Sequence, residues 1–448
     1  MAKFIIYFFC VSLAIILLAG SLISVKMLGG PPLEIKPVTV PTVMGKQNNI
    51  TFHFIDKGAG IRQIDACLIQ GRKTVALGGK VFPSKSWWRG TGIKNQMLSW
   101  RVDPLSLGLS QGKAIFRITT RDASWRDDFK GDEKIWQSEV TIDTIPPAIT
   151  VLSSINDMIT GGSGLISYKT NKEVSRTGVW VNNLFFPGYP RTHGSNEFIA
   201  LIAIPFDAVR PKLYIEATDM AGNIARAGFP YKILYRRPNV DRIEITDGFL
   251  DQKLPEFTSR YPELTGKTPV EIFLQINSKL RRENEEEIRK ICSLNTSPEI
   301  MWQGPFMALK GAARAGFADE RHYFYNGKEI SQANHMGIDI AALAHFPVPA
   351  ANSGKVIFTG YIGIYGNTII IDHGLGLASL YAHLEEFKVN AGDTVKRGTI
   401  IGLTDSTGLA GGDHLHYSML VNGVFVNPIE WLDGNWIKGH ITDKLSAE

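Results

Sequence analysis

Histidines gather toward the C-terminal end of this chain. Of the ten histidines in its 448 residues, seven fall between His322 and His416. Imidazole binds metal ions and changes its charge near neutral pH. The clustering therefore indicates a metal site, proton-transfer chemistry, or both.

Residues 334–341 hold the first pair of candidate groups, His335 and Asp339. Read as a β-strand, this segment places its apolar residues at 336, 338 and 340 on one face. His335 and Asp339 then share the opposite face, with Gly337 opening space between them. This pattern predicts two ligands aimed away from a hydrophobic core.

Two further segments carry the remaining groups. His414 and His416 lie two residues apart in a second strand-like segment, so their imidazoles are expected side by side on its polar face. In the third segment, residues 377–384, Tyr381 and His383 are predicted to share a face. Either motif by itself is more typical of packing or of a surface, and it is their combination that indicates chemistry.

Together these groups match the needs of a hydrolytic metal site. Neutral imidazole and carboxylate are good zinc ligands, and a catalytic zinc keeps three protein ligands and an open position. Such a zinc lowers the pKa of its water to about 7. The chain supplies five such groups, enough for three ligands and for two groups that move protons or stabilise an oxyanion. They are His335, Asp339, His383, His414 and His416.

These motifs resemble the signatures of the lysostaphin/LytM-type zinc metallopeptidases. The resemblance rests on residues 335–339 (HMGID), 381–384 (YAHL) and 414–416 (HLH), and extends to 365–374, 389–402 and 427–432. It covers roughly residues 301–437 of the chain.

The resemblance implies a role for each residue. His335, Asp339 and His416 would ligate Zn²⁺, while His383 and His414 would orient and deprotonate a metal-activated water and stabilise the tetrahedral intermediate. It also implies a small antiparallel β domain with an open groove, and peptidoglycan peptides as substrate. The implied activity is that of an endopeptidase that cuts peptide cross-links.

The other groups of this region receive weaker assignments. Tyr323 or Tyr325 would correspond to a tyrosine of the family that stabilises the transition state. His322, His345 and His373 lie outside the motifs and are predicted to be loop or surface residues without a metal role.

The N-terminus predicts export. Residues 4–23 are almost entirely apolar, with Lys3 before them and Lys26 after them, and about 20 apolar residues span a bilayer as a helix. A cleaved signal peptide processed around residues 19–21 is the alternative. The length of the apolar run favours an uncleaved anchor, and either interpretation places the rest of the chain outside the cytoplasm.

The intervening residues predict a mainly β protein. Short alternating segments such as 50–55 and 114–119, separated by Gly, Ser and Asp, are typical of β-sandwiches that resemble immunoglobulin-like modules. Thr268 begins a helix, with Pro269 at its first position and Glu271 completing a capping box. The predicted parts are a membrane or signal segment at 4–23, β-sandwiches at 33–145 and 146–235, a helical connector at 236–300 and a LytM-like domain at 301–440.

Composition limits the partners. A formal charge of +5 over the whole chain without a dense Lys/Arg cluster predicts no nucleic-acid binding. Cys67 and Cys292 are too far apart in the sequence to predict a disulfide or a cysteine metal site. The predicted partners are peptidoglycan, the membrane through residues 4–23, and envelope proteins through the sandwiches. The predicted location is the inner membrane, crossed once, with the bulk of the chain in the periplasm.

Three other functions stay open at this point. The first is a non-catalytic LytM-like protein that activates cell-wall amidases, although such proteins usually lack some of the five groups. The second is a wall-binding scaffold with an accessory hydrolase, and the third is a secreted bacteriolysin.

Overall fold

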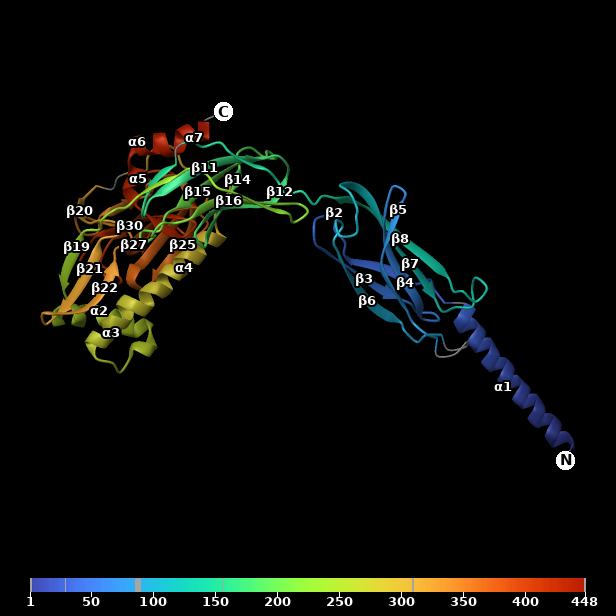
Figure 1. Cartoon of the computed structure of the whole chain (residues 1–448). Coiled ribbons are helices and arrows are strands. Elements are labelled where there is room, and N and C mark those ends of the chain that lie inside the picture. The colour runs from blue at the N-terminus through green and yellow to red at the C-terminus, as the bar shows by residue number, and fades with distance from the viewer. Residues whose placement is uncertain (1, 29, 85–89, 155, 308–309, 447–448) are drawn as a thin grey trace. The chain divides into compact units, whose positions relative to one another are not determined.

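The computed structural model of the protein describes residues 2–28, 30–84, 90–154, 156–307 and 310–446 (Figure 1). The chain divides into two compact units, one of residues 1–147 with 218–224, the other of residues 148–217 with 225–448. Most elements are strands, and they are gathered into several sheets. The expectation of a mainly β protein is thus confirmed.

Helix α1, Ala2–Leu28, begins the first unit. Its stretch Ile5–Val25 has a mean hydropathy of 2.6 and is long enough to cross a membrane. At the helix end, the Trp125 amide donates to the Met27 carbonyl (3.1 Å) and the Arg126 guanidinium donates to the Leu28 carbonyl (2.8 Å). An arginine at a helix C-terminus satisfies carbonyls that lack a partner within the helix. The helix is therefore tied to the β module that follows it.

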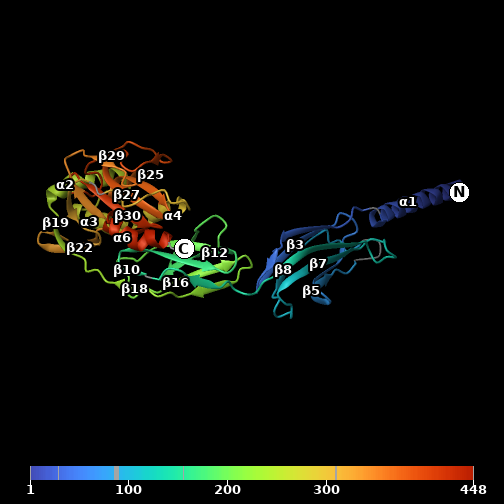
Figure 2. The ribbon, with the colours of Figure 1, turned by 90° about the horizontal axis from the view of Figure 1, so that it is seen from above.

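The first β module consists of two packed sheets (Figure 2). Phe52 of one sheet lies 5.8 Å from Phe116 and 4.8 Å from Trp136 of the other, measured between ring centroids. Aromatic residues on alternating positions therefore build the core between the sheets. One sheet has the order β1-β3-β6 (Glu34–Thr39, Asn48–Ile55, Asn95–Val102), the other β2-β8-β7-β4-β5 (Val43–Met44, Glu133–Ile142, Gly112–Asp122, Ile61–Gln70, Lys73–Val81).

The second β module also has two sheets, joined through buried residues such as Tyr168, whose hydroxyl lies 3.0 Å from that of Thr177. One has the order β14-β15-β11-β9 (Tyr189–Pro190, Glu197–Ala203, Ser163–Thr170, Ile149–Val151), the other β13-β12-β16-β17 (Leu184–Pro187, Val174–Val181, Leu213–Asp219, Ile224–Ala227). Strands β10 (Asp157–Ile159) and β18 (Lys232–Leu234) pair separately.

The second β module shares a buried contact with the C-terminal domain. The Glu430 carboxylate accepts from the Ser163 amide (2.9 Å) and lies 3.1 Å from its hydroxyl, which also accepts from the Trp431 indole (3.1 Å). Burial raises the pKa of Glu430 to about 7. Because these groups are buried and mutually satisfied, the module packs against the domain as part of one core.

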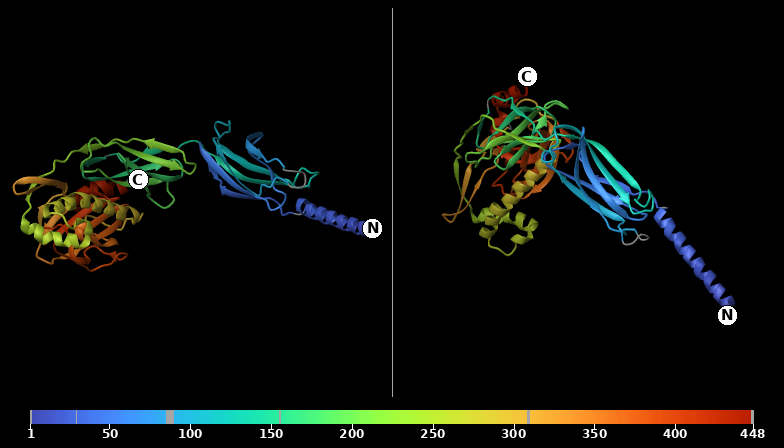
Figure 3. Two further views of the ribbon diagram at one scale, coloured as in Figure 1. Left: turned by 90° about the horizontal axis from the view of Figure 1, so that it is seen from below. Right: turned by 45° about the vertical axis from the view of Figure 1, so that its right-hand side comes forward.

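Helices follow the second module. They are α2 (Asp247–Arg260), α3 (Pro269–Gln275) and α4 (Arg281–Leu294), with the π-helical turn Ile276–Leu280 between the last two. The capping box of Thr268 and Glu271 is present, as predicted. Residues Val240–Glu244, inside the predicted helical connector, instead form β19, because they pair in parallel with β21 (Glu320–Tyr325). Helix α4 packs against β25 (Figure 3).

The C-terminal sheet is antiparallel, as expected. Its order is β20-β23-β30-β27-β26-β25-β28 (Ala312–Ala315, Ile338–Ala341, Leu415–Val421, Leu377–Phe387, Gly366–Gly374, Gly354–Ile362, Thr394–Val395). Strands β24 (Pro347–Pro349), β29 (Ile400–Thr404) and β31 (Val424–Val426) pair at its sides, and β22 (Lys328–Asn334) pairs with β21. The adjacent strands β23, β30 and β27 bring the three sequence motifs together.

Candidate metal centre

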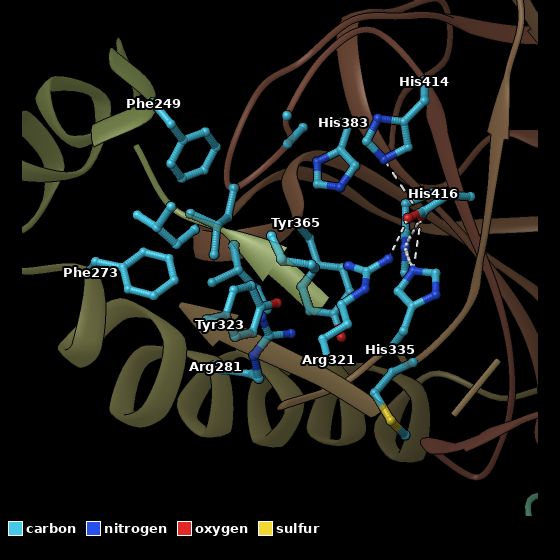
Figure 4. A pocket seen from close by; sticks show the side chains of 18 of the residues that line it. Phe249, Phe273, Arg281, Arg321, Tyr323, His335, Tyr365, His383, His414 and His416 are labelled. Atoms are coloured by element: carbon cyan, nitrogen blue, oxygen red, sulfur yellow. Dashed lines mark hydrogen bonds and ion pairs between the residues drawn. The ribbon is translucent and has the colours of Figure 1, made fainter. Parts of the chain in front are cut away.

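Three side chains converge on one point (Figure 4). His335 Nε2 lies 2.9 Å from Asp339 Oδ1 and 2.9 Å from His416 Nδ1, and His416 Nδ1 lies 2.9 Å from the same oxygen. All three residues are buried. Asp339 and His416 are paired across β23 and β30, whereas His335 lies just before β23 rather than on it. The segment 334–341 is therefore only partly a strand.

The outer nitrogens of the ligand histidines are already occupied. His335 Nδ1 is 2.8 Å from the Gly316 carbonyl, which can only accept, so this nitrogen carries the proton. His416 Nε2 is 3.0 Å from the Ser418 hydroxyl, which itself donates to the Met336 carbonyl and so accepts from the imidazole. Two imidazole lone pairs and a carboxylate oxygen consequently face one another. Such a set of acceptors fits a cation, and the outer hydrogen bonds are those that orient metal-binding histidines.

Two more imidazoles flank the three ligand candidates. The ring of His383 lies 4.8 Å from that of His414 and 5.8 Å from that of His416, between centroids. His414 Nε2 is 3.5 Å from Asp339 Oδ1. Their Nδ1 atoms donate to backbone carbonyls, of Thr407 (2.7 Å) and Gly412 (2.8 Å) respectively. The Nε2 lone pair of His383 is therefore free for a water or substrate, whereas His414 Nε2 faces the Asp339 carboxylate.

His383 reaches the site through a break in its strand. The register between β26 and β27 shifts at this point, and His383 has a φ of 60°. Tyr381 lies beside Tyr417 (5.3 Å between ring centroids), whereas Ala382, the next residue, is the one paired with His416. The prediction that Tyr381 and His383 share a face is thus wrong, because the β-bulge turns His383 to the other side. A positive φ in a residue other than glycine is strained, and such strain is often found at functional sites.

Burial and charge separate the pKa values of the two flanking histidines. Burial lowers the pKa of His383 well below its usual value, and His414 and His416 act in the same direction. Burial also acts to lower the pKa of His414, but the hydrogen bond to Asp339 outweighs it and the pKa is raised. Opposite shifts in neighbouring groups are the arrangement that acid–base pairs require.

The same burial sets the charge of the ligand candidates. It lowers the pKa of His416 to about 4, which keeps that imidazole neutral and able to ligate. Burial acts to raise the pKa of Asp339, but hydrogen bonds from the surrounding histidines hold it well below its usual range. Asp339 is therefore ionised at neutral pH.

The five groups line a cavity of about 370 Å³. Its opposite wall comes from β19 and from the helical segment. The helical segment contributes Phe249, Phe273 and Arg281 (Figure 4). The histidines and this part of the helical segment thus line the same cavity. The sequence of the helices does not predict this wall, because nothing local in it indicates which surface the helices cover.

The remaining sequence assignments have mixed outcomes. Tyr323 lines the cavity, whereas the Tyr325 hydroxyl donates to Asp247 (2.8 Å) and is not part of the lining. His345 is exposed, and His322 is half-buried between two glutamates. His373 is fully buried, with Nδ1 donating to the Ser353 carbonyl and Nε2 2.7 Å from the Ser379 hydroxyl. Its prediction as a loop or surface residue is wrong, since neighbouring strands cover it.

Comparisons with known proteins identify this domain. The sequence profile of peptidase family M23 matches residues 333–428. The DD-carboxypeptidase/endopeptidase Mpg of Neisseria meningitidis serogroup B is 45% identical over 95 residues, which is 21% of this chain and 22% of that protein. The peptidoglycan DD-endopeptidase ShyC of Vibrio cholerae is 39% identical over 94 residues, 21% of this chain and 22% of that protein. The match thus spans about a fifth of each relative's length.

Among solved structures, the catalytic domain of lysostaphin from Staphylococcus simulans is similar over 27% of this chain and 92% of that one, with 31% identity and a TM-score of 0.24. The family match and the relatives confirm the resemblance drawn from the motifs. The chain carries an M23 peptidase domain near its C-terminus, and all five predicted site residues fall within residues 333–428.

Proposed function

We propose, from the M23 domain at residues 333–428, that this protein is a zinc-dependent endopeptidase that hydrolyses peptide cross-links of peptidoglycan. The observation that carries the proposal is the buried His335-Asp339-His416 set with two further imidazoles in one cavity. Of the relatives that match the domain, Mpg is named a DD-carboxypeptidase/endopeptidase and ShyC a peptidoglycan DD-endopeptidase, which supports this proposal.

Zinc is the ion that this donor set fits best. Two neutral imidazoles and one carboxylate are a common ligand set of catalytic zinc, and a thiolate or an all-oxygen shell would point to other metals. A bound Zn²⁺ supplies Lewis acidity and brings the pKa of a water close to neutral. In this proposal His335 Nε2, Asp339 Oδ1 and His416 Nδ1 hold the ion.

His383 and His414 then handle protons. His383, neutral because its pKa is lowered, accepts the proton of the attacking water through Nε2. His414, whose pKa is raised, donates a hydrogen bond to the oxygen that gains charge. The water oxygen bonds to the carbonyl carbon, the carbon–nitrogen bond breaks, and the leaving amine takes the proton from an imidazole. Each peptide bond consumes one water and yields one carboxylate and one amine.

Digestion of purified peptidoglycan by the full chain in detergent tests this function. We expect release of peptides whose masses correspond to cleaved cross-links, with no release after chelation and recovery when zinc is added back. Intact cross-links in every sample, together with stimulation of an added amidase, would instead identify the non-catalytic activator.

We also propose that both β modules are immunoglobulin-like, that the parts begin and end where the sequence predicts except that β19 of the connector pairs with the C-terminal domain, and that α1 is an uncleaved anchor in the inner membrane with the remainder in the periplasm. The packed two-sheet arrangement of each module supports the first point. The contacts of Trp125 and Arg126 with the end of α1 support the third, since they join the helix to folded structure.

A recognition sequence for a site-specific protease, inserted near residue 146, tests both the anchor and the boundary between the two β modules. Cleavage in membrane vesicles is expected to release a soluble fragment with the M23 domain, while the membrane keeps a fragment that begins at or near Met1. A mature protein that starts near Leu22 and needs no detergent would show that α1 is a signal peptide.

A further inference from the structure

Hydrogen-bond donors without partners collect in the catalytic cavity. Among the described residues, Arg281 Nε, Arg321 Nε and Tyr365 Oη are buried and have no hydrogen-bond partner, and all three residues line the cavity. Burial raises the pKa of Tyr365, so its hydroxyl keeps its proton. Guanidinium nitrogens can only donate. Buried polar groups in native proteins almost always have partners, so these donors are available to an acceptor that enters the cavity.

The charges of the cavity point the same way. Arg281 Nη2 donates to the neutral Asn277 amide oxygen (2.7 Å), and among the described residues Arg281 makes no ion pair with a carboxylate. Glu244 also lines the cavity, but its carboxylate is held by Arg242 (2.8 Å). The other acidic residue of the lining is Asp339, a proposed metal ligand. Glu285, four residues further along α4, acts electrostatically on Arg281 but does not line this cavity. The carboxylates of the lining pair with Arg242 and Arg321 instead of Arg281.

The two guanidinium groups are placed differently with respect to the metal ligands. Arg321 Nη2 is 2.8 Å from Asp339 Oδ2, on the side of that carboxylate away from the ligand cluster. Arg321 thus orients a candidate metal ligand, and this role by itself explains its position in the cavity. Arg281, at the start of α4, bonds to Asn277 and, among the described residues, forms no hydrogen bond or ion pair with a ligand candidate, so a substrate would explain its position.

We propose that Arg281, with Arg321 and Tyr365, forms a subsite for a substrate carboxylate beside the scissile bond. This inference rests on the proposed peptidase function and specifies its substrate class. The leaving nitrogen would belong to a carbon that also bears a free carboxylate, as in a D-alanyl bond to the D-centre of meso-diaminopimelate. A bond inside a glycine bridge has no such carboxylate.

Two of the three subsite residues come from outside the family match. Arg281 and Arg321 precede residues 333–428, and Arg281 belongs to the helical segment that walls the cavity. The helices therefore select the substrate as well as limit access. A bidentate, charge-assisted contact of a guanidinium with a carboxylate is the strongest form of this recognition.

Two synthetic peptides measure the subsite in the wild-type protein. Both carry a D-alanyl bond to meso-diaminopimelate, one with the adjacent carboxylate free and one with it amidated. We expect kcat/KM at least roughly 10-fold higher for the free acid, as one charged hydrogen bond implies. Equal values for acid and amide would overturn the inference but leave the peptidase function standing. Cleavage of neither peptide, nor of peptidoglycan, would instead reject the proposed function.

Variants of Arg281 test whether this residue causes the preference for the free carboxylate. Arg281→Ala is expected to lower kcat/KM for the acid roughly 10- to 100-fold, change it little for the amide, and leave the zinc content unchanged. Arg281→Lys should recover part of the preference, because it restores charge without the planar fork. Arg282→Ala, at the exposed next position outside the cavity lining, is the matched control. An equal loss of kcat/KM on the acid and on the amide would show that Arg281 supports the structure of the cavity and does not bind the substrate carboxylate.

Discussion

His414→Ala is expected to keep about one zinc per chain and to lose hydrolysis by roughly 10²- to 10⁴-fold, the contribution of one proton-transfer or oxyanion-stabilising group. The three ligand candidates remain in this variant, and their outer hydrogen bonds to Gly316 and Ser418 do not involve His414. His383→Ala should behave in the same way. The measurement is kcat on cross-linked peptide together with elemental analysis of the same sample.

His345→Ala serves as the control for these variants, because it removes an exposed histidine outside the cavity lining. It should match the wild type in both zinc content and rate. Wild-type turnover in His414→Ala would remove His414 from the mechanism, and loss of zinc in that variant would make it a ligand.

The second large effect concerns the ligands themselves. His416→Ala and Asp339→Ala are each expected to bring the zinc content close to zero and the rate to background. Two remaining donors hold a catalytic zinc poorly, and loss of Asp339 also leaves Arg321 without its 2.8 Å partner. Elemental analysis and peptide hydrolysis are measured before and after zinc addition.

Chelation separates this effect from misfolding. Wild-type protein stripped of metal should regain its rate when zinc is restored, whereas His416→Ala should not. If His416→Ala and His414→Ala lost zinc to the same extent, the division into ligands and proton carriers would be wrong. Full zinc occupancy in Asp339→Ala would exclude Asp339 from the metal site.

Much of the site follows from the sequence alone. The residue types and the short spacings of 335–339 and 414–416 fix which donors lie near one another, because a few residues of extended chain leave little conformational choice. The same holds for the capping box at Thr268 and for the apolar length of α1. Local periodicity and composition determine these features, so no distant contact is needed to predict them.

The tertiary structure decided what depends on contacts between distant segments. His383 faces the candidate metal ligands only because the register between β26 and β27 shifts there, and alternation alone places it on the opposite face. His373 is buried because separate strands close over it. Arg281 enters the catalytic cavity because α4 packs on a sheet formed mostly from later residues. Such positions arise from long-range pairing and packing, which no local pattern in the sequence records.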